Sequence, residues 1–133
     1  MASISNLGSI TLARGDCFKA PLFINIGSDI EPIRLDIRSL PELEIYFGVY
    51  MPYDRFENSF IAKKFNHLDS NELGDVIITI NPEDTLYIRP GSYKYSIKAR
   101  MYDKAYGEWI NTVVDANTFY INWLHWLEMG VII

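Results

Sequence analysis

Apolar and polar residues alternate with a period of two along most of this chain, which is the pattern of a β-strand with one buried face. The alternation is clearest in residues 43–51 and 92–102. No segment keeps the 3.6-residue period of an amphipathic helix. The pattern predicts strand segments at residues 10–13, 17–26, 33–38, 43–51, 60–65, 75–80, 92–102, 108–114 and 117–123. It places Val76, Ile78 and Ile80 on the buried face of the segment 75–80, and Tyr95 and Ile97 on the buried face of the segment 92–102.

Three of these segments have a more specific predicted place. Residues 43–51 are expected to be central in a sheet, because Glu44 is the only charged residue on either face. Residues 60–65 contain two lysines, which is typical of an edge strand. Residues 108–114 and 117–123 predict either one long strand broken near Asp115 or two pieces joined by a bulge.

Turn-forming residues separate the segments at strand-like intervals. Residues 82–86 predict a single helical turn, with Asn81 as its cap and Pro82 at the first helical position. Many short strands with turns between them predict an all-β fold. We expect an immunoglobulin-like antiparallel β-sandwich of about seven to nine strands, formed by one domain over residues 1–121.

A tyrosine near the start of a strand is the most specific structural signal. The sequence Pro-Gly-Ser-Tyr at residues 90–93 follows the predicted helical turn and opens the strand 92–102. At this corner of immunoglobulin-like folds, a tyrosine hydroxyl bonds to the backbone a few residues upstream. Tyr93 is the best candidate for such a tyrosine corner, and Tyr95 is the next. The alternative is that both rings simply fill the core.

Composition and charge exclude several classes of protein. The chain has 133 residues, of which 49% are hydrophobic and 22% charged, and these values suit one globular domain. The net charge of −5 argues against binding to nucleic acid or to anionic lipid. No apolar run reaches the roughly 20 residues that span a bilayer. We also see no signal peptide, so a cytoplasmic place of synthesis is expected.

Candidate catalytic and metal-binding residues are few. Cys17 is the only cysteine, which excludes an internal disulfide, and a cysteine hydrolase would have to combine it with His67 or His125. These three residues also lack the spacing of a zinc site. Residues 69–75 resemble the start of a calcium loop but have leucine at the fifth position, so a plain hairpin loop is favoured. We therefore expect no enzyme activity, no metal, no cofactor and no small-molecule substrate.

An aromatic cluster offers one route to a binding function. Tyr46, Tyr50, Tyr53 and Phe56 lie in or just after the strand 43–51. Exposed aromatic rings beside carboxylates stack on sugars, so a carbohydrate-binding module is the alternative function for this chain. The same residues are also compatible with cross-strand packing or with a protein contact.

The segment 122–133 is the strongest candidate for an interaction site. Eight of its twelve residues are apolar, and two of these are tryptophans. Apolar patches of this kind mark interfaces, and tryptophan is enriched at binding hot spots. We expect the segment to dock on a neighbouring subunit, with Trp123 and Trp126 as anchors, either as an added strand or as a short helix; folding back on its own domain is the alternative. The expected contact residues are Trp123, Leu124, Trp126, Leu127, Met129 and Ile132.

Several turn and strand motifs together resemble those of a known family. The motifs are Gly15-Asp16-x-Phe18, residues 21–27 (PLFINIG), residues 31–34 (EPIR), residues 46–49 (YFGV), residues 74–78 (GDVII), residues 82–85 (PEDT) and Pro90-Gly91-x-Tyr93-x-Tyr95. They resemble small structural proteins of tailed bacteriophages, and in particular the immunoglobulin-like N-terminal module of upper baseplate proteins. The resemblance covers residues 10–121.

The resemblance implies a role in virion assembly. The expected function is that of a structural component of the baseplate, tail, neck or capsid surface, acting by protein–protein contacts. The expected partners are other virion proteins or copies of the chain itself. The expected location is the virion, after synthesis in the host bacterial cytoplasm. Because the chain continues past Ile121 for only twelve residues, with no second domain, a receptor-binding role is not expected.

Overall fold

The computed structural model describes residues 3–4, 7–27, 32–103 and 108–122. Five strands form the larger sheet, in the order β2 (Ile10–Ala13), β10 (Glu108–Asn122), β9 (Gly91–Asp103), β6 (Glu44–Tyr50) and β7 (Ile61–Phe65). All neighbours in it are antiparallel except β2 and β10. The strand pairs of the second layer are also antiparallel, so β2 and β10 form the one parallel pair among the described strands.

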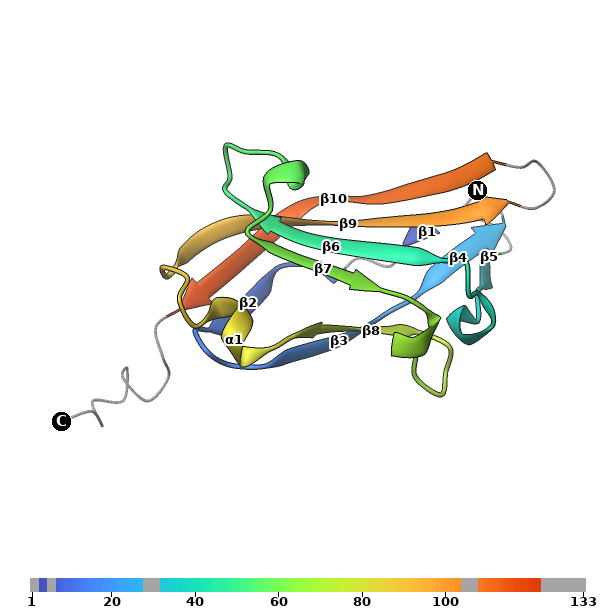
Figure 1. The fold of residues 1–133 in the computed structure, drawn as a ribbon, viewed down its shortest axis with the longest axis horizontal. Helices are drawn as coiled ribbons and strands as arrows, with labels where there is room; N and C mark the ends of the chain where they lie inside the picture. Colours follow the sequence, from blue (N-terminus) through green and yellow to red (C-terminus); the bar gives the residue numbers. More distant parts are fainter. Residues whose placement is uncertain (1–2, 5–6, 28–31, 104–107, 123–133) are drawn as a thin grey trace.

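The second layer consists of two small groups of strands. β3 (Phe18–Leu22) pairs with β8 (Val76–Ile80), and β4 (Ile24–Gly27) lies between β1 (Ser3–Ile4) and β5 (Pro32–Arg34). Figure 1 shows the larger sheet stacked over β3, β8 and β4. The protein is therefore an all-β sandwich of the predicted immunoglobulin-like type, with ten strands in its described part against the seven to nine expected. No helix in the described residues is long and apolar enough to span a membrane.

The core lies between the two layers. β8 contributes three fully buried side chains, Val76, Ile78 and Ile80. From the larger sheet, the Phe47 ring stacks on Tyr95 at a centroid distance of 5.4 Å and meets the edge of Phe119 at 6.4 Å. Because large aromatic rings bury more apolar area than any other side chains, this trio is a major source of the packing energy.

Several predicted elements are confirmed. β6 is central, between β9 and β7, and β7 is an edge strand. β10 is one long strand whose register with β9 shifts between Val114 and Asn117, as predicted for a bulge. The helical turn is α1 (Pro82–Thr85), where the Asn81 N–H donates to the Asp84 side chain at 2.7 Å in a capping box.

Two predicted strands differ from the structure. The segment 17–26 is divided at Phe23, because the chain pairs with β8 up to Leu22 and with β1 and β5 from Ile24 onward. The segment 33–38 remains extended only to Arg34. It then forms a 3₁₀ turn, η1 (Ile37–Ser39), because the Asp36 side chain caps the backbone N–H of Arg38.

The described chain ends within the larger sheet. Asn122, which the sequence assigned to the apolar tail, is the last residue of β10 and pairs with Ala13. Its carbonyl also accepts a hydrogen bond from the Arg14 N–H at 2.9 Å. The predicted contact residues of the tail, Trp123, Leu124, Trp126, Leu127, Met129 and Ile132, all lie outside the described residues.

Candidate interaction site

One edge of β8 has no strand partner over most of its length in the described part of the molecule. β8 pairs with β3 on one side, and its other side forms only an isolated bridge between Val76 and Ser70. The strand reads Val-Ile-Ile-Thr-Ile and contains no charge and no proline. Unpaired backbone groups along an uncharged strand are a ready template for another chain.

Two observations show which residues of β8 direct their backbone groups to the open side. The Asp75 carbonyl accepts from the Asn71 N–H at 2.8 Å on that side, and residues 77 and 79 share its phase. In addition, Pro21 is opposite Ile77 in the register with β3 and has no N–H to donate. The hydrogen-bonded pairs with β3 therefore involve Val76, Ile78 and Ile80, while Ile77 and Thr79 point their backbone groups outward.

The other exposed edges carry features that discourage pairing. β7 has Lys63 and Lys64, and β3 has Lys19 and Pro21. β5 contains a proline and an arginine in three residues, and β2 has only four residues. The edge of β10 beyond β2 is interrupted by the register shift at Val114. Lysine, proline, short length and bulges are the usual means of blocking edge pairing, so β8 stands apart in having none of its own.

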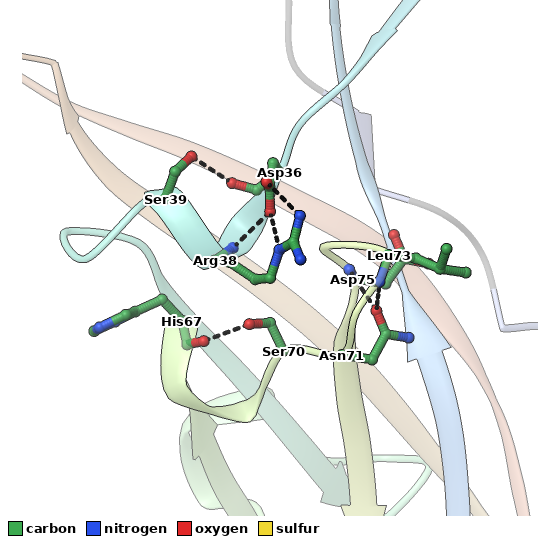
Figure 2. Close-up of polar contacts among 8 residues, drawn as sticks. All are labelled: Asp36, Arg38, Ser39, His67, Ser70, Asn71, Leu73 and Asp75. Carbon is green, nitrogen blue, oxygen red and sulfur yellow. Dashed lines mark hydrogen bonds and ion pairs between the residues drawn. The ribbon is translucent and has the colours of Figure 1, made fainter.

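At the start of β8, the loop of residues 66–75 lies along the edge that is otherwise open (Figure 2). The Asn71 side chain accepts hydrogen bonds from the N–H groups of Leu73 and Asp75, at 2.9 and 3.0 Å. The turn η3 (His67–Asp69) is fixed by its own capping box and by a bond from the Ser70 hydroxyl to the His67 carbonyl at 2.5 Å. The carboxylate of Asp75 accepts hydrogen bonds from the Arg34 guanidinium. This loop has the hydrogen bonds of the plain hairpin that was favoured over a calcium site.

Arg34 and Asp75 form an ion pair beside this loop. Both guanidinium nitrogens that face the carboxylate, Nε and Nη2, donate to it, and the Nε distance is 3.0 Å. Asp75 is only 2% exposed, whereas the Arg34 side chain is half-exposed and lies over the Phe23 ring at 4.3 Å. The pair joins β5 to the start of β8 and so fixes the position of the candidate edge.

A second ion pair nearby is fully on the surface. Arg38 binds the Asp36 carboxylate through Nε and Nη2, each at 2.9 Å (Figure 2). The hydrogen bond from Arg38 holds the pKa of Asp36 below its usual value. In the described part of the chain, no three His, Cys, Asp or Glu side chains are grouped so that they could hold a metal ion.

The four residues of the predicted aromatic cluster do not form an open platform. Tyr50 is buried, with its hydroxyl 2.8 Å from the Ser96 hydroxyl and its ring against the edge of Phe56. Phe56 lies directly over Gly48, where an added Cβ would be 2.7 Å from the ring. Tyr53 is 84% exposed. Cross-strand packing, one of the alternatives considered, therefore accounts for most of the cluster.

Tyr46 belongs to a charged network on the same outer face of the larger sheet. Its hydroxyl donates to the Glu44 carboxylate at 2.5 Å, and Lys64 and Arg100 lie within 3.7 Å of that carboxylate. The tyrosine hydrogen bond lowers the pKa of Glu44, and the same bond raises the pKa of Tyr46. The Tyr46 hydroxyl is thus engaged by Glu44, and the Lys64 ammonium lies 5.7 Å from the centre of the Tyr46 ring.

The residues that a cysteine hydrolase would need are not brought together. Cys17 is exposed and precedes Phe18, which is opposite Ile80 in the register of β3 with β8. His67 lies in η3, beside Val76 at the other end of β8. The length of β8 therefore separates the two side chains, and His125 lies outside the described residues.

The structure contains the hydrogen bond that was expected of Tyr93. Its hydroxyl donates to the carbonyl of Arg89, four residues upstream. The ring also meets the edge of Phe60 at a centroid distance of 5.0 Å. Tyr95, the second candidate, donates instead to the carbonyl of Gly8 and so joins β9 to the segment before β2. Tyr93 thus holds the loop that leads from the second layer into β9.

Replacing Tyr93 by phenylalanine should lower the free energy of unfolding by about 1 kcal/mol, because the Arg89 carbonyl loses its donor while the ring packing stays. Urea unfolding followed by fluorescence measures the change. Tyr87→Phe is the control, since Tyr87 is 88% exposed and its hydroxyl can bond to water in either state. Equal urea midpoints for Tyr93→Phe and the unmodified protein would show that the hydrogen bond has no net value.

Sequence reasoning missed the two outward residues of the candidate edge, Ile77 and Thr79. It identified the strand and its buried face correctly. The available signal was the absence of charge and proline in residues 76–80, in contrast to the lysines of residues 60–65. That signal predicts an unprotected edge only if the strand is known to be at an edge, and strand order is not readable from this pattern.

Comparisons with known proteins give little further information. No protein-family model matches the chain, and no curated protein matches it in sequence. Among solved structures, the chain is similar to AggA, the major subunit of aggregative adherence fimbriae type I from Escherichia coli. The match has 7% sequence identity, covers 92% of this chain and 95% of that chain, and has a TM-score of 0.38. At this TM-score the likeness carries no argument about this protein.

Proposed function

We propose that this protein is a non-enzymatic structural subunit that acts by protein–protein contacts. The open edge of β8 is the observation that supports the proposal best. It is an uncharged strand of five residues with outward backbone groups at Ile77 and Thr79, in a molecule whose other edges carry blocking features. Such an edge is used in proteins that recognise an extended segment by strand addition.

The sequence motifs suggest where such a subunit works. They resemble those of small structural proteins of tailed bacteriophages, so we propose the virion as its location and other virion proteins or further copies of the chain as its partners. The apolar segment 122–133 is the proposed contact that each subunit makes with its neighbour. Of that segment, Asn122 completes β10, and the tryptophans Trp123 and Trp126 follow directly.

Ending the chain after Asn122 tests this function. Asn122 has to be kept, because its pairing with Ala13 and its bond to Arg14 belong to the sandwich. We expect the shortened protein to keep its thermal midpoint and to lose both self-association, measured by sedimentation, and incorporation into virus particles. The double variant Trp123→Ala with Trp126→Ala should reproduce the loss without shortening the chain, since large aromatic anchors dominate interfaces.

Two results would argue against the proposed function. Full incorporation of the shortened protein would show that residues 123–133 are not the contact. A large fall in the thermal midpoint would show that these residues fold back on their own domain. Tyr87→Ala serves as the matched control, since Tyr87 is an aromatic side chain that is 88% exposed and has no proposed part in the contact.

A further inference from the structure

The open edge of β8 defines what an occupant must supply. Ile77 and Thr79 each direct an N–H and a C=O outward, and the Ile77 carbonyl also accepts from the Thr79 hydroxyl at 3.5 Å. Beyond the bridge between Val76 and Ser70, the edge therefore offers donors and acceptors to an extended backbone. The inward side chains Val76, Ile78 and Ile80 are already fully buried. What the edge lacks is therefore a main-chain partner and not a core residue. Uncharged side chains would fit best beside Ile77 and Thr79, both of which are β-branched.

One stretch of this chain outside the described residues is long enough to be that partner. A strand that covers five residues spans roughly 17 Å. The internal and N-terminal stretches outside the description, residues 1–2, 5–6, 28–31 and 104–107, have at most four residues. Residues 123–133 number eleven and contain one acidic residue and no lysine or arginine. They include the β-branched run Val131-Ile132-Ile133, which favours extended structure.

We infer that residues 123–133 of a second copy add as a strand to the open edge of β8. The inference rests on the proposed function and names the surface that receives the segment. A copy's own segment would use part of its eleven residues to pass from the larger sheet, in which β10 ends, to the layer of β8, whereas the segment of a second copy has no such constraint.

The contact has a consequence for the form of the assembly. The donor segment follows β10 and the acceptor edge is β8, so the two copies contribute different surfaces. Each copy then offers one donor and one acceptor, which makes the contact heterologous. A heterologous contact generates rings when the rotation between copies closes and filaments when it does not. The association is therefore expected to continue beyond a dimer.

Thr79→Pro in the full chain is the direct test. Proline removes the outward N–H of Thr79 but leaves the hydrogen bonds between β8 and β3, which involve the alternate residues. The variant should weaken self-association, measured by sedimentation over a concentration series, by about tenfold or more, as the loss of one hydrogen bond and close packing predicts. Thr79→Val is the matched control and should associate within about twofold of the unmodified protein, because it keeps the N–H and the branched side chain and loses only the long hydrogen bond of 3.5 Å from the Thr79 hydroxyl to the Ile77 carbonyl.

A second variant keeps the inference testable if Thr79→Pro fails to fold. Ile77→Lys places a charge on the open edge and keeps every backbone donor, so it should also weaken association while the thermal midpoint stays near that of the unmodified protein. If shortening the chain abolishes association but both edge variants associate normally, the segment docks elsewhere and this inference fails, while the proposed function stands. If neither the shortened chain nor the edge variants change association, both ideas fail.

Discussion

Replacing Arg34 by alanine is expected to lower the free energy of unfolding by about 3 kcal/mol, the lower end of the range for breaking a buried ion pair. Asp75 is 2% exposed, and its carboxylate accepts from two guanidinium nitrogens of Arg34. Without Arg34, a carboxylate remains buried with no cation beside it. Half of the Arg34 side chain is exposed, so water can enter the vacated space and moderate the loss. The thermal midpoint should fall by roughly 10 °C.

A double-mutant cycle separates the buried charge from the lost packing. Asp75→Asn in the Arg34→Ala background removes the uncompensated charge, so the double variant should be more stable than Arg34→Ala alone. Arg38→Ala is the surface control, because both side chains of the Arg38–Asp36 ion pair are exposed. Exposed ion pairs contribute little to the free energy of unfolding. Additive losses for Arg34→Ala and Asp75→Asn would contradict the account.

Replacing Gly74 by alanine should destabilise the fold by a similar amount, about 3 kcal/mol, for two separate reasons. Gly74 has φ +84°, in the left-handed region that costs an L-residue 1–2 kcal/mol. An added Cβ would also lie 3.0 Å from the Asp36 Cα, which belongs to the backbone and cannot simply turn away. The Gly74 carbonyl accepts from the Ile37 N–H at 2.8 Å, so the strain would be transmitted to η1.

Gly8→Ala isolates the conformational part of this effect. Gly8 has φ +71°, but no atom lies within 4 Å of the position that its Cβ would take. The substitution should therefore cost only about 1 kcal/mol. Chemical unfolding gives the unfolding free energy of both variants. The difference between their losses measures the cost of the close contact between the added Cβ at position 74 and Asp36. Equal losses of unfolding free energy for the two variants would mean that the backbone around Asp36 moves to accommodate the added Cβ without an energetic cost.

Hydrophobic alternation was sufficient to predict most strands and their buried faces. It placed Tyr95 and Ile97 inside β9 and Ile78 inside β8, because the side chains of a strand alternate whatever their pairing. It could not show that the chain changes partners at Phe23, since Leu22 and Ile24 keep the same inward phase across the break. The 3₁₀ turn after Arg34 was missed for a related reason. Ile37 is buried in the 3₁₀ turn, as the strand pattern also required, so its apolar character does not distinguish a strand from a turn. The cap that the Asp36 side chain provides favours the turn.

The candidate site depended on features that a linear pattern does not contain. The corner of Tyr93 was predictable because its hydrogen bond spans only four residues. The partner of Asp75 was not, because Arg34 is 41 residues away and nothing in the linear pattern connects the two residues. The open edge of β8 follows from the order of strands in the second layer, which is fixed by contacts between distant segments. The same limit left the aromatic residues near Tyr50 open to three interpretations: cross-strand packing, a protein contact or a sugar site.

Amide hydrogen exchange at Thr79 and Ile77 tests the central claim most directly, that another copy pairs with the edge of β8. Both amides point away from β3, and beyond the bridge between Val76 and Ser70 the described molecule gives this edge no strand partner, which leaves Thr79 the more open of the two. At low protein concentration, we expect them to exchange much faster than the amides of Val76, Ile78 and Ile80. As the concentration rises and the protein associates, protection at these two amides should increase in step with the associated fraction. Association with no change in their exchange would contradict the claim.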